Sequence, residues 1–231
     1  MSRLDRTRIV EAALELLDRQ GLAGVTTRKV AERLGVKSSS LYWHFRDREE
    51  LLDVLADRIV ADAHWPDPTL GWREQAEALM VEYLRCLMAH RDAARLSAGR
   101  APAGPHRLRG AETMLTALVA GGLSDQDAVS ATLVLTTYVV GFALELEGAI
   151  GTGSTASHGT SAGTPTRQYP TLSRMADLVY PDGPAYRFTH GLAFVLDGIA
   201  ARIADAGRGG PRQARRTAGA HDVRTRSRKP T

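Results

Sequence analysis

The sequence predicts an all-α protein, and three observations support this class. Apolar residues recur at helical spacing along most of the chain, and no β-hairpin signal is present. Prolines and glycines separate the helical segments, as at Pro181-Asp182-Gly183-Pro184. With 231 residues, of which 43% are hydrophobic and 24% charged, the chain has the composition of a globular protein with one medium domain or two small ones.

The N-terminal elements form a small helical unit. A first helix ends at Gly21. A second begins at Thr26 or Thr27, either of which can cap it, and ends before Gly35. The serines that follow offer caps for a very short helix over residues 41–45.

A longer connecting helix follows over 48–64, with Asp47 as its N-cap. Further helices are predicted at about 72–89, 92–98, 106–120, 125–147, 168–180 and 184–205. Residues 148–166 have the composition of a flexible loop. The predicted domains are residues 1–47, the connecting helix 48–64, a larger helical domain 65–206 and a disordered basic tail 207–231.

The positive charge of the chain is concentrated at its C-terminal end. The net charge is +4 and the pI about 9.5, but residues 207–231 alone hold eight Lys and Arg against one acid. Residues 1–64 are neutral overall, and residues 65–206 carry a net charge of −3. Basicity of the whole chain is therefore weak evidence for a nucleic-acid partner, although such a tail can add salt-sensitive affinity for DNA.

Residues 25–45 predict a helix-turn-helix. Two short helices are joined by a tight turn at Leu34-Gly35-Val36, and residues 26–48 hold six basic residues against two acids. In this motif the second helix enters the major groove with its N-terminus first, so polar and aromatic residues there face DNA. These residues are Lys37, Ser38, Ser39, Ser40, Tyr42, Trp43 and His44. The alternative is a helical hairpin with Tyr42 and Trp43 in its core and a solvated basic face.

Five segments within residues 4–62 form a specific pattern. They are Ala12–Leu17 (AALELL), Gly21–Arg28 (GLAGVTTR), Val30–Val36 (VAERLGV), Leu41–Phe45 (LYWHF) and Leu51–Asp53 (LLD). This pattern resembles the tetracycline-repressor (TetR) family of bacterial regulators, and is close to its tetracycline-repressor subgroup. The likeness continues more faintly at Trp72, from Cys86 to Asp92 and from Gly141 to Glu145.

The resemblance implies DNA contacts where the residues match the family. Those positions are Thr27, Arg28, Tyr42, Trp43 and His44, with Arg48 keeping only the charge of a usual lysine. An arginine such as Arg28 can hydrogen-bond to guanine O6 and N7. The reading positions Lys37 and Ser38–Ser40 differ from the tetracycline repressor, so we expect a different operator sequence.

The resemblance further implies that residues from about 65 onward form a dimerisation and ligand domain. Helices 125–147 and 184–205 are apolar on more than one face, which favours an intersubunit four-helix bundle; the alternative is that both are core helices of a monomer. The candidate ligand-binding residues are His64, Leu79, Tyr83, Ser97, Arg100, Thr137 and Glu145.

The candidate ligand residues argue against a magnesium–tetracycline effector. Ser97 stands where the resembled repressor has a metal-ligating histidine, so we expect a hydrophobic or aromatic effector and no metal or other cofactor. His64 can instead be a structural histidine, and Glu145 can pair locally. Cys86 fits better as core filler than as a redox sensor.

The sequence as a whole therefore predicts a ligand-responsive transcriptional regulator. We expect a homodimeric, cytoplasmic repressor with no membrane span and no catalytic residues, which binds a palindromic operator and is released by a small molecule. The glycine-rich patterns at 151–156 and 159–163 resemble enzyme motifs but follow a helix instead of a strand, and His158 between them has no catalytic partner. The alternatives are a helical protein or enzyme that binds or modifies a small molecule, and a non-specific DNA-binding protein.

Overall fold

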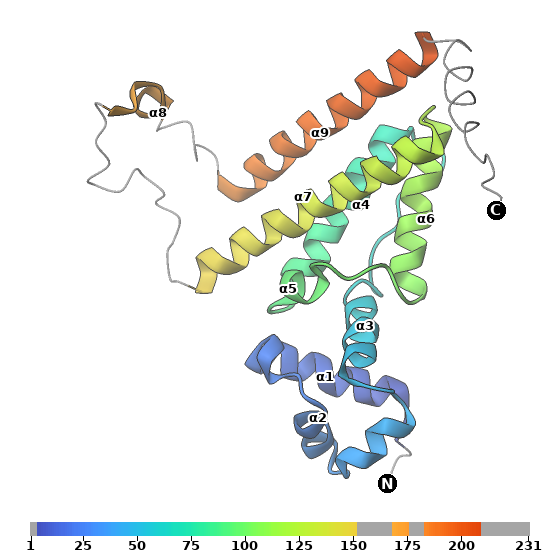
Figure 1. Ribbon diagram of the computed structural model, residues 1–231, viewed down its shortest axis with the longest axis vertical. Helices are drawn as coiled ribbons and strands as arrows, with labels where there is room; N and C mark the ends of the chain where they lie inside the picture. Colours follow the sequence, from blue (N-terminus) through green and yellow to red (C-terminus); the bar gives the residue numbers. More distant parts are fainter. Residues whose placement is uncertain (1–3, 152–167, 176–182, 209–231) are drawn as a thin grey trace, which may run out of the picture.

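The computed structural model describes residues 4–151, 168–175 and 183–208, and these residues are helical apart from connecting turns and loops. A small N-terminal unit contains α1 (Arg6–Gln20), η1 (Leu22–Gly24), α2 (Thr27–Leu34), η2 (Ser38–Trp43) and α3 (Arg48–Ile59). The larger part contains α4 (Trp72–Met88), α5 (Ala93–Ser97), α6 (Pro105–Ala120), α7 (Asp125–Gly151), α8 (Pro170–Met175) and α9 (Gly183–Arg208). Figure 1 shows α3 extending from the first unit toward the second. The predicted all-α class is confirmed.

The caps of the N-terminal helices explain their boundaries. Thr26 accepts a hydrogen bond from the main-chain N–H of Lys29, and Asp47 accepts one from Glu50, so each side chain satisfies a free donor at a helix start. Gly35 ends α2 in the left-handed conformation, with φ of 67°, which glycine adopts without a steric cost. The predicted N-caps of α2 and α3 are therefore confirmed, with Thr26 in that role for α2.

The prediction of a very short helix over 41–45 is wrong in its extent and type. The element is the 3₁₀-helix η2, which begins at Ser38 and ends at Trp43. It is closed by tight bonds between residues three apart, such as His44 N–H to the Leu41 carbonyl, and no serine side chain caps it. The connecting helix predicted over 48–64 ends at Ile59, with Val60 as its C-cap.

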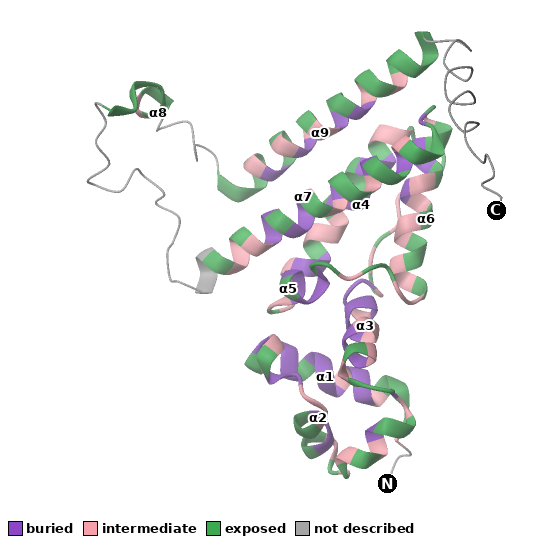
Figure 2. Cartoon of the chain, viewed as in Figure 1, coloured by how far each residue is buried: buried purple, intermediate pink, exposed green. Residues whose placement is uncertain are grey.

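The larger part is built around α4, α6 and α7, which pack against one another, while α9 lies along α7 (Figure 1). The apolar faces of these helices form one core with the N-terminal unit. The largest fully buried side chains that the larger part contributes to this core include Leu87, Met114, Leu118, Leu135 and Leu192. Burial of such side chains stabilises the fold by about 1.5–3 kcal/mol each. Figure 2 shows that α9 keeps a long exposed face.

Several predicted ends of the C-terminal helices need correction. α7 continues to Gly151 into the loop predicted over 148–166, because a single glycine costs a helix only about 1 kcal/mol and alanine and isoleucine follow it. α9 continues to Arg208, whose charge suits a helix C-terminus, so the predicted tail starts later than 207. Of the helix predicted over 168–180, the described part is α8. The patterns at 151–156 and 159–163, His158 and the tail beyond Arg208 lie outside the described residues.

One helix of the larger part meets the length and composition criteria for a membrane span, which buried core helices also meet. Among the described residues, one helical stretch passes that test: Asp125–Gly148, with a mean hydropathy of 1.7. The apolar surface that α7 leaves exposed, at Val129, Leu133 and Val134, therefore requires another explanation.

Candidate DNA interface and ligand cavity

The surface of η2 presents two large aromatic side chains to solvent. Trp43 is 89% exposed and Tyr42 57% exposed, whereas Leu41 and Phe45 beside them are buried with Val30 of α2. This pattern excludes the alternative in which Tyr42 and Trp43 fill the core of a helical hairpin. An exposed tryptophan on a short helix after a glycine turn is instead available to an external partner.

The other predicted DNA-contact residues lie around η2 in different environments. Lys37, Ser39 and Arg28 are exposed, and the Arg28 guanidinium is 2.7 Å from the Glu32 carboxylate on the same helix. The half-buried members of the set are Thr27, Ser38, Ser40, His44 and Arg48. DNA contact by any of these residues stays a prediction.

Arg48 has a structural role that the sequence does not show. Its Nε donates to the Val25 carbonyl at 2.9 Å, and a terminal nitrogen donates to the Leu22 carbonyl at 3.4 Å. These bonds tie the start of α3 to the loop before α2. The Glu50 carboxylate of α3 accepts hydrogen bonds from the main-chain N–H of Arg46 and from the Arg6 guanidinium of α1, so it links these two helices. These bonds lower the pKa of Glu50 to about 2.

A cavity of about 710 Å³ lies in the larger part, between α4, α6, α7 and the segments 60–65 and 97–102. A volume of this size holds a drug-sized molecule. The predicted ligand residues that line it are His64, Leu79, Tyr83, Ser97, Arg100 and Thr137. Ligand contact at these positions stays a prediction.

Glu145 does not line this cavity, so its expected place there is wrong for the described chain. Its carboxylate is 69% exposed and pairs with Arg187 of α9 at 3.0 Å. The alternative of local pairing describes its position. The sequence also misses Trp65, Met114, His106 and Arg107 as lining residues. Helical periodicity can place such residues on an inner face, but it does not separate a cavity wall from a packed core.

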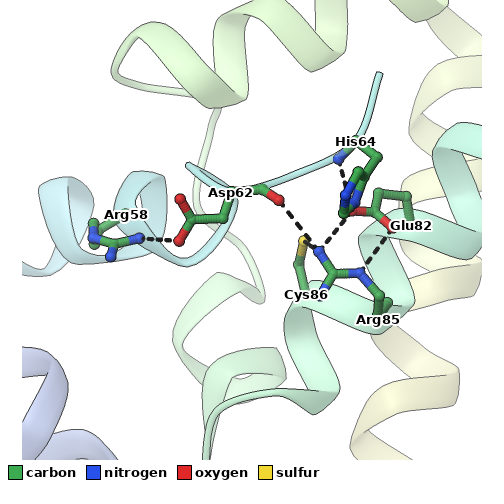
Figure 3. Close-up of polar contacts among 6 residues, drawn as sticks. All are labelled: Arg58, Asp62, His64, Glu82, Arg85 and Cys86. Carbon is green, nitrogen blue, oxygen red and sulfur yellow. Dashed lines mark hydrogen bonds and ion pairs between the residues drawn. The ribbon is translucent and has the colours of Figure 1, made fainter. Parts of the chain in front are cut away.

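Two lining residues of the cavity, His64 and Glu82, belong to a polar cluster (Figure 3). Glu82 of α4 accepts hydrogen bonds from the main-chain N–H of His64 at 2.7 Å and from the Arg85 guanidinium at 2.7 Å, and the His64 Nδ1 lies 2.9 Å from the same carboxylate. Arg85 is the main cause that lowers the pKa of Glu82 to about 2. His64 thus has a structural partner while its side chain remains 85% exposed.

Cys86 lies beside this cluster in Figure 3 and is buried. Burial raises the pKa of its thiol above the ordinary value of 9.0, which keeps the thiol protonated at neutral pH. A protonated, buried cysteine is a poor nucleophile and fits the interpretation of Cys86 as core filler.

Two cavity residues connect the cavity directly to α3. The Arg100 guanidinium pairs with Asp53 and with Glu49 of α3, each at 2.6 Å. The main-chain N–H of Arg107 donates to the buried carboxylate of Asp57 on α3 at 2.8 Å. Because α3 also packs on α1, these bonds join the cavity wall to the unit that carries η2.

We expect Asp57→Ala to lower the free energy of unfolding by about 1–2 kcal/mol, because the start of α6 loses its side-chain acceptor. For a chain of this size this is a fall in Tm of about 2–4 °C per kcal/mol, measurable by thermal denaturation. Asp57→Asn keeps an acceptor oxygen and should lose less. Asp62→Ala, at an exposed carboxylate on the segment that follows α3, serves as the matched control and should change stability by less than about 0.5 kcal/mol. Equal stability of Asp57→Ala and the unmodified protein would contradict this role.

Two family models match this chain, one over each of its two parts. The family model "Bacterial regulatory proteins, tetR family" matches residues 9–55, and "Tetracyclin repressor-like, C-terminal domain" matches residues 65–203. The class A tetracycline repressor of transposon 1721 from Escherichia coli is 37% identical over 205 residues, which cover 87% of this chain and 93% of that protein.

Two solved structures show the same fold. ActR of Streptomyces coelicolor in complex with actinorhodin has a TM-score of 0.79 and 32% identity, covering 89% of this chain and 100% of that one. BioQ with its double-stranded DNA operator has a TM-score of 0.65 and 27% identity, covering 86% and 99%. With matches over both its helix-turn-helix unit and its cavity-bearing part, the chain belongs to the TetR family of ligand-responsive, DNA-binding transcriptional regulators.

Proposed function

We propose that this protein is a homodimeric repressor that binds a palindromic operator and leaves it when a small molecule fills the 710 Å³ cavity. The observation that carries the proposal is the pairing of Arg100, a cavity residue, with Asp53 and Glu49 of α3. A ligand that displaces the Arg100 segment changes the support of α3 and hence the position of η2. The ligand binds the displaced state more tightly than the operator-bound state, and this difference in binding free energy, typically about 1–3 kcal/mol, lowers the affinity for the operator.

DNA recognition is assigned to η2 and the start of α2. Lys37 and Ser38–Ser40 approach base edges, while Tyr42, Trp43 and His44 contact phosphate and sugar. Arg28 is exposed and can exchange its Glu32 partner for a guanine, since a surface ion pair is worth little. The structure of BioQ, a related chain, with its double-stranded DNA operator supports this role.

The effector is an organic molecule other than the magnesium–tetracycline chelate. Ser97 offers a hydroxyl at the cavity wall where the resembled repressor has a metal-ligating histidine, and Glu145 is held by Arg187 outside the wall. These residues do not fit a magnesium ion, which prefers carboxylate ligands and several waters. The complex of ActR with actinorhodin shows that a related chain accepts an organic ligand.

The proposal is tested by mixing the purified protein with sheared genomic DNA from its own source and sequencing the bound fragments. We expect enrichment of one or a few sites, each with a palindrome whose half-sites lie about one DNA turn apart. DNase I footprinting on the enriched fragment should protect that palindrome. Uniform enrichment would instead favour the non-specific DNA-binding alternative, and turnover of a bound small molecule would favour an enzyme. We propose the cytoplasm as the location, where the operator is accessible.

A further inference from the structure

Arg107 differs from the other charged residues of the cavity wall. Glu82 is paired with Arg85, and Arg100 is paired with Asp53 and Glu49. The Arg107 guanidinium instead donates to two main-chain carbonyls, of Ala101 at 3.1 Å and of Arg100 at 2.9 Å. Within the described ranges, no carboxylate lies within ion-pairing distance of it. The cavity therefore contains one cation whose charge no acid neutralises directly.

The nearest acid that contacts this residue does not remove that charge. The Asp57 carboxylate accepts a hydrogen bond from the main-chain N–H of Arg107, at the first turn of α6. There the free N–H groups and the helix dipole already favour a negative charge. Glu82, across the cavity, has its pKa lowered to about 2 by Arg85 and by hydrogen bonds from His64, so that cluster is charged but internally balanced. Among the described lining residues, Glu82 is the only acid.

Two hydroxyl groups line the same cavity as Arg107, those of Tyr83 and Ser97. Burial raises the pKa of the Tyr83 phenol, while the positive charge of Arg107 acts in the opposite direction. The phenol remains protonated at neutral pH and can donate a hydrogen bond. Ser97 is buried and offers a second hydroxyl donor. One region of the wall thus combines a cation with two neutral donors.

The rest of the wall is apolar. Leu79, Met80, Met114, Val140 and Leu144 line it together with Trp65. An apolar surface of this kind selects for a hydrophobic ring system, and the unneutralised cation selects for a negative group on it.

We infer that the effector is a hydrophobic organic anion whose carboxylate, sulfonate or similarly ionised group binds the Arg107 guanidinium beside Tyr83 and Ser97. This inference rests on the proposed role of the cavity as the effector site. An anion at this position competes with the carbonyls of Arg100 and Ala101 for the Arg107 donors. Its binding therefore acts on the same segment that holds Asp53 and Glu49.

The test uses two fluorescent probes that differ in one group. 8-Anilinonaphthalene-1-sulfonate carries a sulfonate, and N-phenyl-1-naphthylamine has the same rings without it. We expect the purified full-length protein to bind the sulfonate at least about tenfold more tightly, because a charge-assisted hydrogen bond is stronger than a neutral one. Arg107→Met should remove this preference while leaving the affinity for the neutral probe unchanged, which also shows that the cavity is intact. Arg107→Lys should retain most of it.

Two controls locate the effect. Arg109→Met removes a cation of the same helix that lies over Trp65 and is not part of the wall, and it should leave the preference intact. Thr137→Trp fills the cavity and should abolish binding of both probes. Equal affinities of the two probes for the unmodified protein, or equal losses in Arg107→Met and Arg109→Met, would overturn the inference alone. Failure of both probes to bind a protein that still binds its operator would overturn the role of the cavity and, with it, the inference.

Discussion

Replacing both Tyr42 and Trp43 by alanine is expected to weaken operator binding about 100-fold, which is about 2.7 kcal/mol. Both side chains extend from η2 into solvent, and neither has a large buried area to lose. Each offers a polar hydrogen and an aromatic surface to the phosphate and sugar of a DNA backbone, with a net contribution of roughly 1–1.5 kcal/mol. Fluorescence anisotropy with the palindrome recovered from genomic selection measures the change.

The control for this double variant separates DNA contact from folding. Tyr169→Ala removes an aromatic side chain of similar exposure, 48%, on the segment before α8, and should leave affinity unchanged. Thermal denaturation of the double variant should show a Tm close to that of the unmodified protein, because the buried neighbours Leu41 and Phe45 are retained. If operator affinity survives both substitutions, the assignment of η2 to DNA is wrong.

The sequence predicts the local features of this fold well because their causes are local. A threonine or aspartate before an apolar stripe caps a helix because its side-chain oxygen accepts a hydrogen bond from the main chain three residues later, so the starts of α2 and α3 can be predicted from sequence. Gly35 permits the left-handed turn that ends α2. The 3₁₀ form of η2 cannot be predicted in this way. Three consecutive serines are compatible with either helix type, and packing of Leu41 and Phe45 on α2 decides between them.

The site residues also differ in whether their positions have local causes. Family resemblance places six of the seven ligand candidates at the cavity, but it also includes Glu145, whose position is determined by Arg187 on a helix far along the chain. Asp57 and Arg107 carry no motif at all. Their roles depend on the meeting of α3 with the first turn of α6, which only the three-dimensional structure shows.

Replacing Val134 and Phe194 by aspartate is expected to make the protein monomeric and to lower its affinity for the full palindrome by about 100- to 1000-fold. Val134 of α7 is 54% exposed and Phe194 of α9 is 67% exposed, and both line a shallow groove between the two helices with Val195 and Ile199. A second copy of the chain is the occupant that the proposed palindromic operator requires, since helix-turn-helix dimers bind two half-sites about one DNA turn apart. The proposed subunit contact would cover apolar side chains that α7 leaves exposed, such as Val134.

The large effect on affinity arises because dimerisation makes binding of the second half-site intramolecular. Two linked reading heads gain about 10²- to 10⁴-fold over one, with no new contact to DNA. Size-exclusion chromatography with light scattering measures the mass, and anisotropy on full and half palindromes measures the affinity. The double variant should bind both DNAs equally weakly, whereas the unmodified protein should strongly prefer the full site.

The control variant is Val81→Asp with Val119→Asp, at exposed apolar positions of α4 and α6. It places the same charges outside the groove and should leave the protein dimeric. If the groove variant remains dimeric, the subunit contact lies on another surface, and the exposed apolar face of α7 has a different role.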